Sequence, residues 1–184
     1  IVRELGKFIL DGSLYRGAKP VLWSVVEKTA LADAEVEYKD HTSNTVYVKF
    51  KIIKSRINEL VNNSILIWTT TPWTIPGNRA LAFNKSFSYS LVKKNSSDTY
   101  FIIASELIDK LKNDTELKIE KINDFKGEIL EKTICKHPLN DFGYKFKVPL
   151  LAADFVTKEE GTGIVHIAPG HGLDDFNLAK KNNI

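Results

Sequence analysis

The stretch WTTTPWTIPGN, residues 68–78, sets three consecutive hydroxyl side chains beside two prolines. Thr69, Thr70 and Thr71 follow a buried, strand-like run, and the prolines fix the backbone φ angle and remove two backbone donors. The residue before a proline is itself driven toward extended geometry. The hydroxyls are therefore expected on a stiff edge, where they would suit a ligand rich in hydroxyl or ester groups.

Asn78 ends this stretch with an amide that offers two donors and an acceptor. A plainer interpretation is a strand end whose threonines were selected for β propensity and whose prolines only terminate it. The stretch alone leaves both interpretations open.

The stretch GTGIVHIAPGHGLDDF, residues 161–176, gathers two of the four histidines with two carboxylates. A metal site could use His166, His171 and one aspartate, because imidazole and carboxylate both bind zinc. The two histidines are separated by a Pro-Gly turn, however, and match no helical ligand pair. A Ser-His-Asp hydrolase has less support, since no serine lies in a GxSxG setting.

A third interpretation places a carboxylate at the start of a helix, where it holds a cationic amine, while a histidine at a strand end borders a small pocket. The structural alternative is that Asp174 only caps or charges the first helical turn. That alternative explains one acid well, but it explains two acids, two histidines and four glycines poorly.

The elements that must position these residues are mostly short strands. The clearest strand covers 45–53, where strict alternation places on one face Val46, Val48, Phe50 and Ile52. Further strands are predicted over 64–69, 80–83, 88–92, 99–104, 127–130 and 163–168.

Few helices are predicted. They cover 1–11, 105–114 and the segment after Gly172; the second has Ser105 as its N-cap and an apolar side made by Leu107, Ile108 and Leu111. The pattern indicates an α+β fold that is rich in β structure, with a barrel-like or folded mixed sheet and a few peripheral helices.

The composition is that of one globular domain with a sizeable core: 184 residues, 43% apolar and 27% charged. We find no apolar run long enough to span a bilayer and no signal peptide, so we expect a cytoplasmic protein without a membrane partner. The single Cys135 agrees with that location. The net charge of +3 permits a nucleic-acid partner without predicting one. Because the chain has no methionine and begins and ends inside predicted helices, we expect an excised part of a larger protein.

Together, the two quoted stretches resemble the editing (CP1) domain inserted into class I aminoacyl-tRNA synthetases for branched aliphatic amino acids. Within that family the chain is most similar to the isoleucyl branch, since valyl and leucyl relatives differ at Trp73 and Thr74. The flanking stretches LYRGAKPVLWS and ALADAEVEY resemble the segments that join this insertion to the catalytic body. The resemblance implies a single editing domain over 1–184, with connecting segments at roughly 1–44 and 176–184 and an editing core over 45–175.

The resemblance implies proofreading hydrolysis of misacylated tRNA, chiefly valine esterified to isoleucine tRNA, by a positioned water. An apolar pocket rejects a substrate one methylene smaller by only about 1–3 kcal/mol, and this family is the usual example of that limit. A second, smaller pocket would admit valine and reject isoleucine. By matching positions, Asp175 resembles the carboxylate that holds the substrate ammonium group, and His166 resembles the wall that excludes the extra methylene.

Thr69, Thr70 and Thr71 resemble the peptide that positions the ester, the terminal adenosine and the water, and Trp73 and Asn78 resemble further residues of the same site. No protein nucleophile is needed, because an aminoacyl ester is already activated and a positioned water with preorganised hydrogen bonds suffices. The resemblance leaves His171 as a turn residue and Asp174 as a helix-terminal charge.

The chain also departs from the synthetases. It has neither the HIGH nor the KMSKS signature, so no amino-acid activation is expected and ATP belongs to the parent enzyme. Ser24 and Glu27 stand where some isoleucyl enzymes have a cysteine pair, so zinc is also assigned to the parent, and no cofactor or metal is expected for editing. The implied partners are the 3′ end of isoleucine tRNA carrying valine and the remainder of the synthetase, with the domain itself a monomer.

Two other functions remain open at this point. One is a binding module that holds the tRNA 3′ end without turning it over. The other is a metal-dependent hydrolase built on His166, His171 and Asp175.

Overall fold

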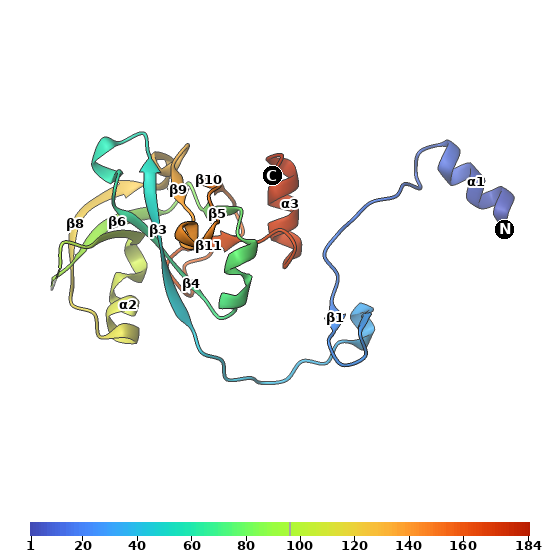
Figure 1. Ribbon diagram of the computed structural model, residues 1–184, viewed down its shortest axis with the longest axis horizontal. Helices are drawn as coiled ribbons and strands as arrows, with labels where there is room; N and C mark the ends of the chain where they lie inside the picture. Colours follow the sequence, from blue (N-terminus) through green and yellow to red (C-terminus); the bar gives the residue numbers. More distant parts are fainter. Residues whose placement is uncertain (96) are drawn as a thin grey trace. The chain divides into compact units, whose positions relative to one another are not determined.

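The structure, a computed structural model, describes residues 1–95 and 97–184 (Figure 1). The chain divides into two compact units, Ile1–Glu37 and Tyr38–Ile184, and each is described by itself.

The first unit is small and has no buried helix face. Helix α1 covers Val2–Leu10, which confirms the predicted helix, and it ends where Gly12 adopts the left-handed conformation that favours glycine. A short antiparallel pair follows, β1 (Trp23–Ser24) with β2 (Thr29–Ala30), and then the 3₁₀ turn η1 (Asp33–Glu35).

The second unit contains the remaining elements. Its strands are β3 (Val46–Lys54), β4 (Ser64–Thr69), β5 (Ala80–Phe83), β6 (Ser88–Lys94), β7 (Tyr100–Ala104), β8 (Ile119–Lys126), β9 (Ile134–Lys136), β10 (Lys147–Ala152) and β11 (Ile164–Ile167). Its helices are α2 (Ile108–Thr115) and α3 (Leu173–Lys181). Its short 3₁₀ segments are η2 (Asn58–Leu60), η3 (Pro72–Gly77), η4 (Ser105–Leu107), η5 (Gly127–Leu130) and η6 (Asn140–Phe142).

The nine strands of this unit form one mixed sheet in the order β11-β5-β10-β9-β3-β4-β7-β6-β8. The β5–β10 and β4–β7 pairs are parallel, and the other pairs are antiparallel. Strands β11 and β4 are not hydrogen-bonded neighbours in the described chain, yet they lie against each other. The sheet is therefore folded over rather than closed into a barrel, which confirms the folded mixed sheet among the two predicted forms.

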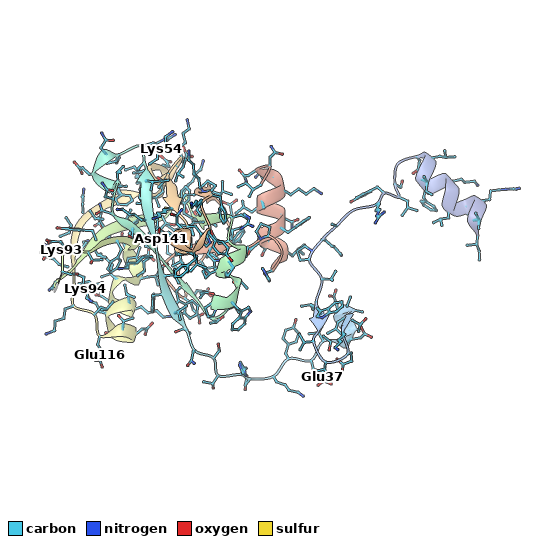
Figure 2. All side chains as sticks on the ribbon, viewed as in Figure 1. Glu37, Lys54, Lys93, Lys94, Glu116 and Asp141 are labelled. Carbon is cyan, nitrogen blue, oxygen red and sulfur yellow. The ribbon has the colours of Figure 1, made fainter. Side chains whose placement is uncertain are left out.

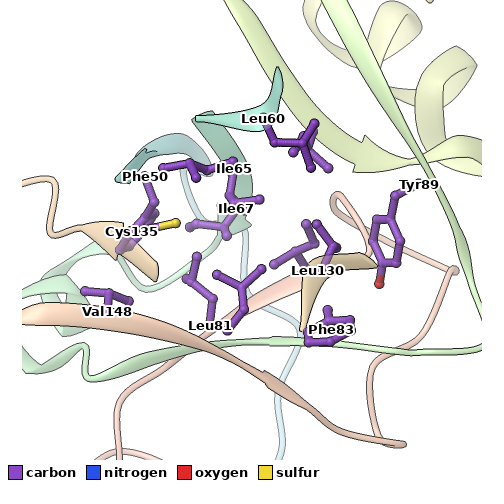
Figure 3. Packing of buried hydrophobic residues seen from close by; sticks show 14 of the residues in the cluster. Phe50, Leu60, Ile65, Ile67, Leu81, Phe83, Tyr89, Leu130, Cys135 and Val148 are labelled. Atoms are coloured by element: carbon purple, nitrogen blue, oxygen red, sulfur yellow. The ribbon is translucent and has the colours of Figure 1, made fainter. Parts of the chain in front are cut away.

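Buried side chains from many of the strands pack together in the main core (Figure 3). Alternation along β3 buries Phe50 and Ile52, which pack with Ile65 and Ile67 of β4. The predicted inward face of β3 is thereby confirmed. Cys135 lies fully buried in the same cluster, and burial raises the pKa of its thiol far above the usual range.

The two longer helices cover other parts of the sheet. Helix α2 packs Ile108 and Leu111 onto an apolar cluster from β4, β6, β7 and β8. Helix α3, drawn in red in Figure 1, packs Leu178 onto a cluster that contains Ala80, Ala82 and Ile167 of β5 and β11. This packing fixes the start of α3 beside the end of β11, where the candidate site lies.

Two predictions about the elements were wrong, and three strands of the second unit were not predicted. Residues 127–130 form η5 rather than a strand, because the Glu131 N–H donates within the chain to the Glu128 carbonyl and so closes a turn there. Ser105 does not cap α2; the hydroxyl of Ser105 donates to Asp124 at 3.2 Å instead. Strands β8, β9 and β10 were not predicted.

Charged side chains such as Lys54 and Glu116 lie on the outside of the second unit (Figure 2). Of the helices that the structure describes, none is long and apolar enough to cross a membrane.

Candidate functional site

The threonine stretch begins inside β4 and continues into the 3₁₀ turn η3. Thr69 is the last, buried residue of β4, and its hydroxyl accepts a hydrogen bond from the Thr71 backbone N–H at 3.0 Å. The hydroxyls of Thr69 and Thr71 lie 3.3 Å apart. Thr70 is exposed, and its hydroxyl has no hydrogen-bond partner within the described chain. The three threonines therefore differ: two are tied to each other and one is free.

The second stretch forms a tight loop before β11. Gly161 and Gly163 both have left-handed φ angles, of +73° and +70°. The carbonyl of Gly163 accepts a hydrogen bond from the Tyr89 hydroxyl at 2.9 Å, and the carbonyl of Thr162 accepts one from the Ala104 N–H at 2.8 Å. This glycine-containing loop, residues 161–163, is thus held against β6 and β7 and forms a fixed wall.

A pocket of about 360 Å³ lies between the two stretches. It is lined by Trp68, Thr69, Thr70, Thr71, Phe155, Thr157, Glu160, Gly161, Thr162, Gly163, Ile164, Val165, His166 and Asp175. The fold thereby brings the three threonines, His166 and Asp175 to one cavity, although they are far apart in the sequence.

His166 is a buried residue of β11, and its protonation state follows from its contacts. The Thr74 hydroxyl has one proton and donates it to the Thr71 carbonyl at 2.8 Å. The 3.1 Å contact between Thr74 Oγ1 and His166 Nε2 therefore has Nε2–H as the donor. Nδ1 then lacks a proton, and it is buried without a partner in the described chain. Burial, with a smaller effect of His171, lowers the pKa of His166 to about 4, so the ring is neutral at pH 7.

Asp175 lies in the first turn of α3 and faces the pocket. The Ala168 backbone N–H donates to Asp175 Oδ2 at 2.8 Å. A Cβ at Gly172 would lie 3.3 Å from Asp175 Cγ, so the glycine allows the carboxylate to fold back against the turn. Burial raises the pKa of Asp175, and the Ala168 N–H partly opposes that effect. Oδ1 has no hydrogen-bond partner among the described residues, and it is the oxygen available to a cation.

The four other residues that the sequence analysis considered for the site do not line this pocket. Trp73 is 71% exposed, and Asn78 is fully buried with its amide donating to the Ala80 carbonyl at 2.8 Å. His171 is exposed, and its ring lies against Gly77. Asp174 is exposed on α3 and borders a different hollow.

The alternative metal site lacks a suitable donor set. Within the part of the chain that the structure describes, no three His, Cys, Asp or Glu side chains are grouped so that they could hold a metal ion. This applies to the proposed set of His166, His171 and Asp175, which the fold does not group as metal ligands. The geometry therefore does not favour the metal-dependent hydrolase.

Several pocket residues were not predicted. Trp68 lies in the first quoted stretch, directly before the threonines, so its place in the sequence was a signal that could have identified it as a site residue. Phe155, Thr157 and Glu160 come from the loop after β10, whose sequence has no pattern that points to a site.

The sequence of this chain matches a family model described as tRNA synthetases class I (I, L, M and V), over residues 1–139. An isoleucine–tRNA ligase from Pelagibacter ubique is 53% identical over 189 residues, which cover 100% of this chain and 21% of that protein. One from Rhodopseudomonas palustris is 47% identical over 193 residues, covering 99% of this chain and 19% of that protein. The chain thus spans about a fifth of the length of the curated relatives it matches.

Solved structures are similar in fold. The crystal structure of GlLeuRS-CP1 has a TM-score of 0.59 at 18% sequence identity and covers 76% of this chain and 65% of that one. The editing domain of the P. knowlesi cytosolic leucyl-tRNA synthetase has a TM-score of 0.55 at 15% identity, covering 76% of this chain and 62% of that one. At these identities the similarity establishes the fold of the chain.

Proposed function

Since this chain belongs to the class I tRNA synthetase family (I, L, M and V) and has the fold of synthetase editing domains, we propose that its pocket hydrolyses the ester of a wrongly charged tRNA. The inferred substrate is chiefly valine on isoleucine tRNA, because the relatives that match the whole chain are isoleucine–tRNA ligases. The observation that carries the proposal is the single pocket shared by the threonine segment, His166 and Asp175.

Asp175 is proposed to bind the α-ammonium group of the aminoacyl ester. Its Oδ2 is held by the Ala168 N–H, which fixes the carboxylate and leaves Oδ1 to accept from the substrate. A charge-assisted hydrogen bond of this kind is about twice as strong as a neutral one. The ammonium group would therefore anchor the amino acid with its side chain directed along the pocket wall.

His166 is proposed to act as the wall that measures the amino-acid side chain. Its Nε2 is bonded to Thr74, and its Nδ1 is buried, so neither nitrogen is placed to take a proton from a water in the pocket. A rigid neutral ring can exclude one methylene by overlap, whereas attraction alone discriminates by only about 1–3 kcal/mol.

The hydrolytic step is proposed to use a positioned water. Water attacks the ester carbonyl carbon, the bond to the ribose oxygen breaks, and free valine and the tRNA 3′ hydroxyl are released. The freely available hydroxyl of Thr70 is the candidate to orient the water or the terminal adenosine, since Thr69 and Thr71 bond to each other. Preorganised donors of this kind lower the barrier without a protein nucleophile.

The proposal is tested with Asp175→Ala and the neighbouring Asp174→Ala as matched control. Both remove one negative charge from the first turn of α3, but only Asp175 lines the pocket. We expect Asp175→Ala to lower kcat/KM for deacylation of valyl-tRNA(Ile) by roughly a hundredfold, as loss of a positioning contact does. The control should retain most of the wild-type rate.

Three results would argue against the proposal. Equal rates in the two variants would remove Asp175 from its assigned role. Binding of the charged tRNA with the ester left intact would indicate a binding module instead. Loss of activity with a chelator, restored by added metal, would indicate a metal-dependent hydrolase.

A further inference from the structure

His137 is a buried histidine that the proposed reaction does not use. It follows β9 and is 1% exposed. Its ring stacks on Tyr144, with ring centroids 5.0 Å apart and an interplanar angle of 17°, and it also packs against Phe146 and Phe50. A polar ring enclosed by aromatic side chains needs partners for both nitrogens.

Both nitrogens of His137 have such partners, and together they fix its tautomer. The Leu139 backbone N–H donates to Nδ1 at 3.1 Å, so Nδ1 has no proton. Nε2–H then donates to the Ile75 carbonyl at 3.0 Å. Burial lowers the pKa of His137 by more than the bond to Ile75 raises it, which keeps the ring neutral at pH 7.

The Ile75 carbonyl belongs to η3, the turn that carries the threonine segment toward His166. It also accepts the Asn78 N–H at 2.9 Å. The preceding residue, Thr74, donates to the Thr71 carbonyl and accepts from His166 Nε2. A displacement of η3 would therefore move two parts of the pocket wall together.

We propose that His137 is a positioning residue that sets the place of η3 through the Ile75 carbonyl, and through η3 the place of His166 and of the Thr69–Thr71 segment. On this basis the size discrimination of the pocket depends on a side chain that does not line it. The expected effect on selectivity rests on the proposed editing function. The hydrogen-bonded connection from His137 through η3 to His166 does not, because it is part of the fold.

Two substitutions of His137 separate its two hydrogen bonds. In His137→Gln the side-chain amide reaches as far as Nε2 and can donate to the Ile75 carbonyl, while the bond from Leu139 is lost. In His137→Asn the side-chain oxygen lies near the position of Nδ1 and can accept from Leu139, while the bond to Ile75 is lost. Leu111→Ala, in the cluster under α2, is the control that lowers stability without contacting η3.

The measured quantity is the ratio of valyl to isoleucyl ester hydrolysis by the full 184-residue chain. We expect His137→Asn to reduce this ratio by roughly tenfold to a hundredfold, in the range that a misplaced contact costs. His137→Gln and Leu111→Ala should keep the wild-type ratio even where their melting temperatures fall. Side-chain ¹⁵N shifts of His166 should change in His137→Asn alone.

A purely structural role for His137 predicts a different result. In that case the Asn and Gln variants would behave alike, or the ratio would follow the melting temperature in all three variants, and the proposal would be overturned. If the wild-type chain hydrolyses neither ester, the proposed editing function fails. The ¹⁵N shifts of His166 then decide on the positioning role alone, with equal shifts in the Asn and Gln variants overturning it.

Discussion

At the scale of single residues, a neutral histidine in the pocket wall links the site to the pH dependence of stability. Burial lowers the pKa of His166 to about 4, whereas a histidine in an unfolded chain has a pKa of about 6.5. Between these two pH values the unfolded chain takes up a proton that the folded chain does not. The free energy of unfolding therefore falls as the pH falls through this window, by up to about 1.4 kcal/mol per pH unit from this residue.

His166→Gln removes this titration, so we expect a shallower loss of stability between pH 6.5 and pH 4.5 than in the wild type. Urea unfolding at several pH values in that window measures the difference. The control is His41→Gln, the same substitution at an exposed histidine that does not line the pocket. Parallel curves for His166→Gln and the wild type would contradict the buried, neutral state of His166.

The candidate site residues that the sequence predicted fall into two groups. Thr69, Thr70, Thr71, His166 and Asp175 line one pocket. Trp73 and Asn78 stand in the same stretch but do not line it, because η3 turns the chain after Thr71 and directs one side chain to solvent and the other into the interior. A linear motif thus indicates which segment forms a wall, but the direction of each side chain depends on the turn.

At the scale of elements, the glycine-containing loop before β11 has one position, Gly163, where a side chain does not fit. Gly163 combines a φ of +70° with close packing, since a Cβ at this position would clash with the Ala104 methyl group of β7. Gly143 has a φ of +100°, but a Cβ there would meet no atom within 4 Å. Substitutions at Gly163 and Gly143 therefore separate two costs in folding free energy: that of the backbone conformation, which both share, and that of the steric clash, which only Gly163 has.

We expect Gly163→Ala to lower the free energy of unfolding by about 1–3 kcal/mol more than Gly143→Ala, which is the usual cost of overpacking a core. Both variants should share the cost of about 1 kcal/mol for a non-glycine residue in the left-handed region. Urea unfolding measures the two values. Equal losses in the two variants would mean that the loop moves away from β7 at little cost.

The elements that the sequence did not predict have physical reasons for being missed. Strand β8 is an edge strand whose residues are mostly exposed, so it lacks the alternation that identified β3. Strand β9 has three residues, too few for any period. Strand β10 contains Pro149, which is usually excluded from strands; it lies where pairing passes from β9 to β5. The other strands of this sheet were predicted because their buried positions carry apolar residues, and these residues form the alternating or continuous apolar runs by which a strand is identified.

At the scale of the whole molecule, the apolar core and the pocket both belong to the second unit. The three core clusters draw their buried residues from between Phe50 and Leu178, and the pocket is lined by residues between Trp68 and Asp175. Helix α1 has no buried residue, and Trp23 in the following pair is 58% exposed. The core clusters and the pocket of the second unit are thus made by residues of that unit.

We accordingly expect a chain reduced to residues 38–184 to unfold with a free energy within about 1 kcal/mol of the whole chain, since every residue of the three core clusters is retained. Its selectivity for valyl over isoleucyl ester should also be unchanged. The matched deletion at the other end, of residues 173–184, removes Leu178 from the third cluster and Asp175 from the pocket. That deletion should cost at least about 1.5–3 kcal/mol, the value of one buried aliphatic side chain, and abolish the selectivity. A large loss of stability from the first deletion would show that residues 1–37 contribute to the core, and the division of the chain into two units would have to be redrawn.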